Sequence, residues 1–160
     1  MDAEFRWVDG SPEDLQDRLD RLAEELVDQL ESAARDIDVR IRGAADENAP
    51  VDRGRLGSSL ESAVRVEGGT VRMVVGTNLE YARPMEEGAD PFMPPVSELR
   101  GWAHRVLGDA DAAFGVAMSI AENGLEERRY LRDAFEDNLD WALRRLNRAV
   151  ERAFEEVGLA

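Results

Sequence analysis

The sequence predicts an α+β fold in which two long amphipathic helices, one near each end, pack on a small antiparallel β-sheet, with two short helices inserted. Three observations lead to this prediction. Apolar residues recur at steps of three and four near both ends, an alternating pattern replaces them in between, and prolines and glycines separate the segments. A chain of 160 residues is long enough for one core, so we expect a single domain over residues 1–160.

The first long helix is predicted to start at Ser11 and to end before Pro50. Ser11 can cap the helix, Pro12 fits its first position, and Glu13 and Asp14 favour the positive end of the helix dipole. Pro50 cannot continue a helix. We expect one buried stripe, made of Leu15, Leu19, Leu22, Leu26, Leu30, Ala33, Ile37 and Ile41.

A β-hairpin is predicted next, because the period of the apolar residues changes to two. Gly68 and Gly69 tolerate the positive φ of a tight turn. The residues expected on one face are Leu60, Val64 and Val66 before the turn and Val71, Met73 and Val75 after it. A third extended piece is expected within Asn78 to Glu86.

Three helices are predicted in the second half, after the prolines at 91, 94 and 95. The first is a short helix that Gly108 can end, the second runs over residues 111–123 before Gly124, and the last starts at about Tyr130 and stops before Gly158. Their apolar residues are Leu99, Trp102 and Val106; Phe114, Ala117, Ile120 and Ala121; and Leu131, Ala134, Phe135, Leu139, Ala142, Leu146, Val150, Ala153 and Val157.

The charge is strongly negative. The 35 acidic residues outnumber 20 basic ones, giving a formal net charge of -15, and every basic residue is arginine. Surface carboxylates hold water and cations in brine, where self-repulsion is screened within about 3 Å at 1 M salt. This composition favours a halophilic source; an acidic mesophilic protein is the alternative. It also argues against wrapping nucleic acid, which needs basic side chains to neutralise phosphates.

Groups that carry catalysis or bind cofactors are scarce. The chain has no cysteine, one histidine and no glycine-rich phosphate loop, so we expect no enzyme activity, no cofactor and no specific metal site. His104 is interpreted as a packing or surface residue, and Asp133, Asp137 and Asp140 as part of a solvated face. With no apolar run long enough to span a membrane and no signal-like N-terminus, we expect a soluble protein that is intracellular when made.

Five blocks of sequence follow one another in a recognisable order. Asn48-Ala-Pro-Val-Asp-Arg-Gly-Arg-Leu-Gly-Ser-Ser-Leu60 is similar to the "A-P-V-D-T-G-x-L-R-x-S-I" signature of the neck, tail-completion and minor-tail proteins of tailed phages. Val74-Val-Gly-Thr-Asn-Leu-Glu-Tyr-Ala82 is similar to "V-G-T-N-x-x-Y-A", and Met85-Glu-Glu-Gly88 fits the following "V-E-F-G-T". Pro94-Pro-Val-Ser-Glu-Leu-Arg-Gly-Trp102, with Ile120-Ala-Glu-Asn-Gly124, and Arg129-Tyr-Leu-Arg-Asp-Ala-Phe135 match later blocks. Arg53, in place of threonine, and Arg129-Tyr130, in place of Pro-Phe, depart from the pattern.

The resemblance implies a structural virion protein of the head-tail connector. It would form a homo-oligomeric ring of six or twelve copies that joins the capsid portal complex to the tail. Its partners would be a head-completion or connector protein above and the tail tube or tail terminator below, with viral DNA passing through and no membrane. Tail-terminator or minor-tail protein is the alternative role. A small nucleic-acid-binding regulatory protein is the alternative from another class.

The signature segment has a structural and an assembly interpretation. Its proline and glycine can redirect the chain from helix to strand, while its two arginines can dock on an acidic neighbour, including another copy of the chain. Tyr81 and Glu86 are either core or turn residues, or contacts between subunits. The candidate assembly residues are Pro50, Asp52, Arg53, Gly54, Arg55, Ser59, Asn78, Tyr81, Glu86 and Gly88.

Overall fold

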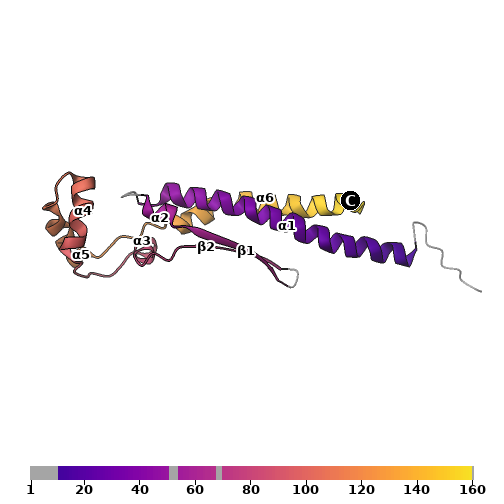
Figure 1. Ribbon diagram of the computed structural model, residues 1–160, viewed down its shortest axis with the longest axis horizontal. Coiled ribbons are helices and arrows are strands. Elements are labelled where there is room, and N and C mark those ends of the chain that lie inside the picture. Colours follow the sequence, from indigo (N-terminus) through magenta and orange to yellow (C-terminus); the bar gives the residue numbers. More distant parts are fainter. Residues whose placement is uncertain (1–10, 51–53, 68–69, 160) are drawn as a thin grey trace, which may run out of the picture. The chain divides into compact units, whose positions relative to one another are not determined.

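The computed structural model describes residues 11–50, 54–67 and 70–159, and Figure 1 shows its elements in order. The fold is α+β with a two-stranded antiparallel sheet, as predicted. The elements are α1 (Pro12–Asn48), α2 (Arg55–Ser58), β1 (Glu61–Glu67), β2 (Thr70–Gly76), α3 (Ala82–Glu87), α4 (Val96–Leu107), α5 (Ala112–Asn123) and α6 (Tyr130–Glu156). The single-turn helices α2 and α3 were not predicted.

Helix α1 starts where the capping pattern places it. The Oγ of Ser11 accepts a hydrogen bond from the backbone N–H of Asp14 at 3.2 Å, and the Asp14 carboxylate accepts one from the N–H of Ser11 at 2.8 Å. This reciprocal pair satisfies N–H groups that have no partner inside the helix.

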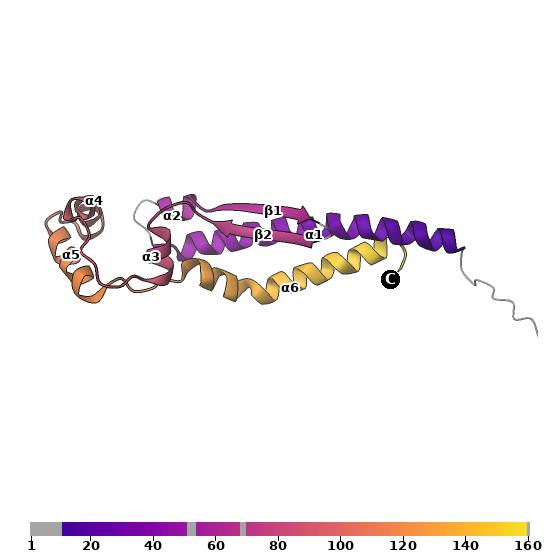
Figure 2. The same cartoon turned by 90° about the horizontal axis from the view of Figure 1, so that it is seen from below.

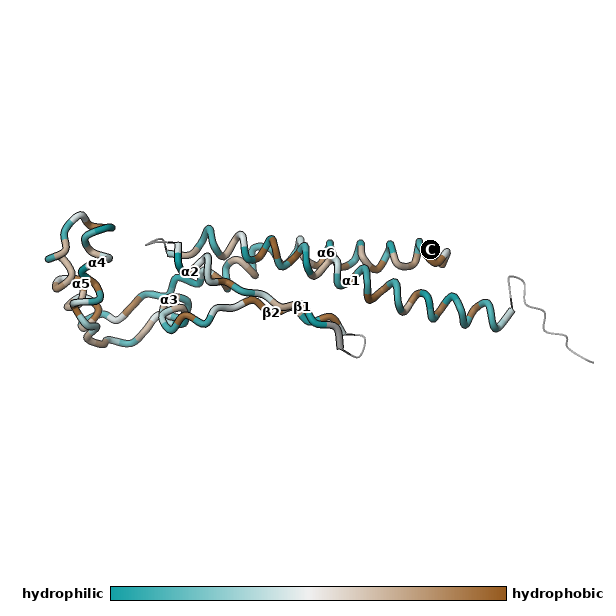
Figure 3. Tube along the Cα trace, viewed as in Figure 1, coloured by the Kyte–Doolittle hydropathy of each residue, from teal (hydrophilic) through white to brown (hydrophobic). Residues whose placement is uncertain are grey.

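The stripe of α1 is buried only in part. Ala33, Ile37 and Ile41 are buried, as predicted, but Leu15 and Leu19 are 40% and 49% exposed. The expectation of a fully buried stripe is therefore wrong for the start of α1. Hydrophobic and hydrophilic residues alternate along this helix (Figure 3). The exposure of Leu15 and Leu19 leaves two large apolar side chains accessible near its N-terminal end.

Helix α6 ends in a Schellman motif. The N–H of Gly158 donates to the carbonyl of Glu155 at 3.0 Å, and the N–H of Leu159 donates to the carbonyl of Phe154 at 2.9 Å. Gly158 has a φ of 65°, which glycine adopts without strain. The predicted end of the helix is confirmed.

The buried face of α6 differs from the predicted stripe. It consists of small residues, chiefly Ala134, Asn138, Ala142, Ala149 and Ala153. Small side chains let a neighbouring element approach closely and leave the larger ones beside the buried face rather than in it. The expectation of burial is thus wrong for the exposed residues Phe135, Leu139 and Val150, and Leu143 is exposed with them.

The hairpin has the predicted alternation. Val64, Val71, Met73 and Val75 are half-buried on one face, and the two strands run side by side (Figure 2). The expected burial of the Val66 side chain and the turn at Gly68-Gly69 lie outside the described residues. The third extended piece is wrong: the chain turns after Leu79, whose carbonyl accepts the N–H of Ala82 at 3.0 Å, and α3 follows.

Helices α4 and α5 form a helical hairpin and pack against each other. Gly108 ends α4 in the left-handed conformation with a φ of 77°, and Arg100 of α4 pairs with Asp111 at 3.0 Å. Small buried residues, Ala103, Ala113 and Ala117, allow the close contact, while larger apolar residues point outward. The exposed ones are Val106, Leu107, Phe114 and Met118.

Contacts between Cα atoms divide the chain into two compact units. The first contains Met1–Ile37, Val64–Met73 and Asp140–Ala160; the second contains Asp38–Ala63 and Val74–Leu139. Because α1, α6 and both strands run through the two units, the division does not test the prediction of a single domain. Within the residues described, no helix has the length and apolar character of a membrane span.

In the first unit, α1 and α6 run antiparallel. The guanidinium of Arg145 pairs with Asp36 at 2.7 Å, and Arg18 donates to the carbonyl of Gly158. A residue early in α1 thus meets the end of α6, and a later one meets its middle. In the second unit the same two helices are joined by the Arg40 Nε, which donates to the Asn138 Oδ1 at 2.6 Å.

Candidate assembly site

The signature segment makes the transition from α1 to the hairpin. Gly54 has a φ of 65°, and it precedes the single turn α2. Leu56 and Leu60 point inward, where they join a buried cluster with Ala45 and Ala49 from the end of α1. The cluster is completed by Ala82, Tyr130 and Ala134. The apolar residues of the signature therefore pack α2 against α1, α3 and α6.

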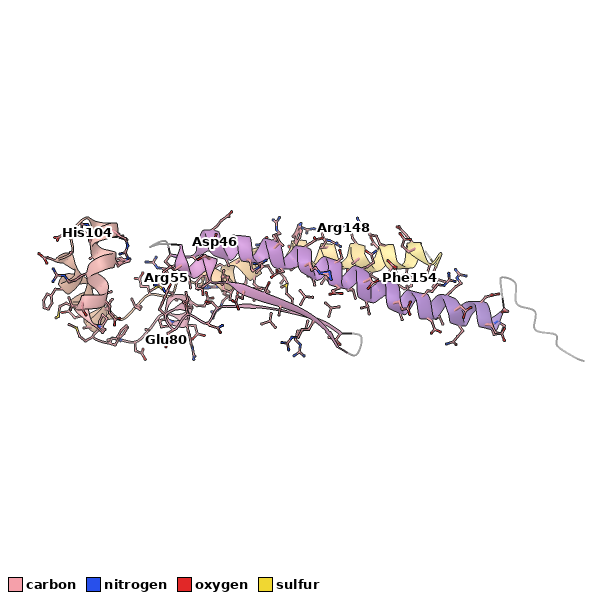
Figure 4. The ribbon with its side chains drawn as sticks, viewed as in Figure 1. Asp46, Arg55, Glu80, His104, Arg148 and Phe154 are labelled. Atoms are coloured by element: carbon pink, nitrogen blue, oxygen red, sulfur yellow. The ribbon has the colours of Figure 1, made fainter. Side chains whose placement is uncertain are left out.

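Gly57 packs directly against α1. A Cβ atom added at this position would lie 1.5 Å from Asp46 Oδ1 and 3.1 Å from the Asp46 Cα. Asp46 and Arg55 are labelled in Figure 4, on α1 and α2 respectively. A side chain at position 57 would fit only if the Asp46 side chain moved away, a constraint the sequence alone did not reveal.

Ser59 connects the signature with the end of β2. Its Oγ lies 2.7 Å from the Thr77 Oγ1 and 2.7 Å from the Leu56 carbonyl oxygen. Thr77 also accepts the N–H of Leu79 at 3.2 Å, which starts the turn toward α3. The two phage-like blocks, 48–60 and 74–82, thus meet through these hydroxyl groups. Thr77 was not among the candidates, although its place in the Gly-Thr-Asn run was a signal.

Glu86 joins the third block to the last helix. Its carboxylate oxygens accept hydrogen bonds from the N–H groups of Leu131 and Arg132, each at 2.9 Å. The carbonyls of Met85 and Glu86 accept further hydrogen bonds from Arg128 and Arg129. Burial raises the pKa of Tyr130, the first residue of α6. The negative charge of the Glu86 carboxylate raises this pKa further, and so does the interaction with Tyr81.

Gly88 lies where the segments leading to and from the α4–α5 hairpin pair. Ala89 and Leu125 form an antiparallel bridge, with N–H to carbonyl distances of 3.0 and 2.8 Å. A Cβ at Gly88 would lie 2.7 Å from the Leu125 carbonyl oxygen, and one at Gly124 would lie 2.2 Å from that of Ala89. Both glycines have a positive φ, so the close pairing depends on them. An open groove beside the bridge is lined by Arg83, Pro84, Glu87, Gly88, Ala89, Asp90 and Leu125.

The other candidate residues are spread over the surface. Pro50 is half-buried, and Gly54, Arg55 and Asn78 are exposed. Tyr81 is 40% exposed. Asp52 and Arg53 lie outside the described residues. The structure therefore brings Ser59 and Glu86 into intrachain contacts and leaves the exposed residues open to a partner; an assembly role for the ten residues stays a prediction.

Polar clusters in the described part of the chain do not form a metal site: no group of three or more His, Asp or Glu residues there could hold an ion. His104 lies exposed on α4 (Figure 4). Asp133 pairs with Arg129 at 3.1 Å, and Asp137 and Asp140 are exposed. This arrangement agrees with the interpretation of these residues as a solvated helix face.

Part of the chain matches a known family. Residues 13–88 match the family model described as "Bacteriophage HK97-gp10, putative tail-component". The matched stretch runs from the start of α1 through the hairpin to the end of α3 and covers slightly less than half of the chain. No curated protein and no solved structure matches the chain. The match supports a relationship with the neck and tail proteins of tailed phages.

Proposed function

We propose that this protein is a structural subunit of the neck or tail of a tailed virus. The observation that supports this most strongly is the match of residues 13–88 to a phage tail-component model. Beyond Gly88 the chain still resembles such proteins at Pro94–Trp102, Ile120–Gly124 and Arg129–Phe135. The proposal therefore extends over most of the chain and includes the α4–α5 hairpin.

The local structure fits an assembly role. The signature segment is a packed junction between helices and strands, while large apolar side chains remain exposed on other elements. Contiguous exposed apolar surface marks sites that a partner covers. Large exposed apolar residues occur on α1, α5 and α6, for example Leu19, Phe114 and Leu139.

The specific role we propose is a ring at the head-to-tail joint. Six or twelve identical subunits in a head-to-tail cyclic arrangement would close a channel for DNA. A head-completion or connector protein would bind above, and the tail tube or its terminator below. Acidic walls would keep DNA from adhering, because like charges repel. A tail-terminator or minor-tail position is the alternative within the class.

We also propose a halophilic source. The net charge of -15 and the complete use of arginine as the basic residue favour a protein that folds and assembles at high salt.

The experiment is to locate the protein in virions. Mass spectrometry of purified particles, with antibody labelling in electron micrographs, should find it at the neck or tail. Deletion of the gene should yield filled heads and tails that do not join. Absence from the particle would contradict the proposal. In that case, retention of duplex DNA by a monomer in molar salt would favour the regulatory alternative.

A further inference from the structure

The outer face of the β1–β2 hairpin carries two arginines, Arg65 and Arg72, that pair with none of the other residues the structure describes. The half-buried valines lie on the other face, so the exposed side chains of Ala63, Arg65, Thr70, Arg72 and Val74 share the outer one. The two strands are equal in length on either side of a two-residue connection, a register that places Arg65 opposite Arg72. Like charges directly opposite each other destabilise a strand pair.

This basic pair is unusual for so acidic a chain. Among the residues that the structure describes, neither Arg65 nor Arg72 has an ion pair or a side-chain hydrogen bond, although acidic residues exceed basic ones by 15. Val74, the next outward residue after Arg72 on β2, is 58% exposed. The face therefore combines positive charge with an apolar side chain, and we call it the hairpin face.

The complementary combination lies on α6. Leu143 and Val150 are seven residues apart and thus share one side of the helix, where they are 50% and 36% exposed. Asp140 and Glu151 border the same side, and both are exposed. No ion pair or hydrogen bond to either carboxylate occurs in the described structure. We call these four residues the α6 flank.

From this complementarity we infer that the hairpin face of one copy docks on the α6 flank of a second copy. Val74 contacts Leu143 and Val150, and Arg65 and Arg72 pair with the carboxylates at the border. The inference deepens the proposed function and rests on it, because it names the surfaces that join the subunits. The two patches differ, so each copy can bind one neighbour on each side. Such head-to-tail contacts close into a ring when the rotation permits.

Charge and chemistry favour a second copy over DNA as the occupant. A phosphate backbone would neutralise the arginines but would leave Val74 exposed, whereas the α6 flank covers both. The overall charge of -15 also opposes approach to DNA. At high salt the ion pairs weaken while the apolar contact persists, so the same interface can hold in brine.

Reciprocal charge reversal tests the inference. R65E/R72E makes the hairpin face acidic, and D140R/E151R makes the α6 flank basic. Each variant alone should lose self-association in native mass spectrometry and sedimentation, because its own two patches then repel. An equimolar mixture should assemble again, with the two variants alternating. R65E/R72E keeps two like charges opposite each other, so the stability of the hairpin itself is matched.

A control variant separates the interface from net charge. R148E/R152E reverses two exposed arginines on the side of α6 that faces away from Leu143 and Val150; Figure 4 labels Arg148. This variant has the same net charge as R65E/R72E and should assemble like the wild type. Circular dichroism should show equal helix content in all variants. Equal loss in the control, or no recovery in the mixture, overturns the inference.

Cysteine cross-linking tests the contact directly, since the chain has no cysteine of its own. Singly substituted V74C and L143C proteins are mixed and oxidised. The expected product is a disulfide-linked heterodimer between positions 74 and 143, formed faster than either homodimer. Equal yields of all three dimers would overturn the inference, as would a wild-type protein that stays monomeric at high concentration. If retention of DNA depends on Arg65 and Arg72 while assembly does not, DNA is the occupant.

The inference and the proposed function fail in different ways. If the protein is found in virions but these substitutions do not change its self-association, the proposed function stands and the docking contact is wrong. If the protein assembles through the hairpin face but is absent from virions, the contact stands and the proposed function is wrong.

Discussion

The side chain of Glu86 closes the N-terminus of α6 by accepting a hydrogen bond from the backbone N–H of Leu131 at 2.9 Å. Its second oxygen accepts the N–H of Arg132 at the same distance. A carboxylate at this end of a helix is favoured by the aligned peptide dipoles. The cap is supplied from 45 positions earlier in the chain, so it stabilises the tertiary structure as well as the helix.

Replacement of Glu86 should therefore destabilise the fold. We expect E86A to lower the free energy of unfolding by about 1–2 kcal/mol, because two backbone N–H groups lose their acceptors. E86Q keeps one acceptor oxygen and should cost less. Chemical denaturation followed by circular dichroism measures both. E87A is the matched control, since Glu87 makes only an exposed pair with Arg83; equal losses in E86A and E87A would contradict the capping role.

Gly57 should be sensitive to substitution. G57A places a methyl group 1.5 Å from the Asp46 Oδ1, so this side chain must rotate away, and 3.1 Å from the Asp46 Cα, so the backbones of α2 and α1 must separate slightly. We expect a loss of about 1–3 kcal/mol in unfolding free energy. G43A in the interior of α1 meets no atom within 4 Å and should stabilise by about 0.5–1 kcal/mol. A neutral G57A would show that the junction is loosely packed.

Tyr130 should make the protein sensitive to alkali. It is 2% exposed, and burial, with Glu86 and Tyr81 nearby, raises its pKa above the ordinary value. The unfolded chain then ionises first. The contribution to stability is complete below the ordinary tyrosine pKa of about 10 and is lost as the pH rises through the folded-state pKa.

The measurement for Tyr130 is a series of unfolding curves at rising alkaline pH. Because the chain has no lysine or cysteine and only two tyrosines, few other groups titrate in this window. Wild-type stability should fall with pH, and the Y130F protein should fall less steeply. Parallel slopes for the two proteins would show that Tyr130 is not the group responsible.

The main elements of the fold could be predicted because they depend on local signals. Capping at Ser11, alternation around Gly68-Gly69 and the left-handed glycines at 108 and 158 all act within a few residues. Burial on α1 and α6 was predicted less well. A helical period identifies an apolar side but not how much of it a partner covers, and small residues took the core positions that the larger Leu139 was expected to fill.

The contacts of the candidate site are mostly long-range and could not be read from single residues. Glu86 reaches α6, and Ser59 meets Thr77 across the hairpin. The resemblance placed Glu86, Gly88 and Ser59 among the candidates, but it could not distinguish a structural role from an assembly role for them. The helix α3 was missed for a similar reason, since its single turn is set by backbone hydrogen bonds near Leu79 rather than by a periodic pattern.

Stability should rise steeply with salt. On α1 the acidic residues Glu13, Asp17, Asp20, Glu24, Asp28 and Glu31 recur at steps of three and four, which places like charges beside each other along the helix. We expect the free energy of unfolding to increase between about 0.05 M and 1 M KCl, because the screening length falls from more than 10 Å to about 3 Å.

A charge-reduced variant tests the cause of this salt dependence. D17N/E24Q/D28N removes three exposed carboxylates from the acidic side of α1. It should gain about 1 kcal/mol or more at low salt, by relief of several like-charge neighbours, and little at 1 M. Thermal unfolding across the salt series measures both slopes. If the variant and the wild type respond equally to KCl, repulsion along α1 is not the source of the effect, and the proposal of a halophilic protein loses its structural support.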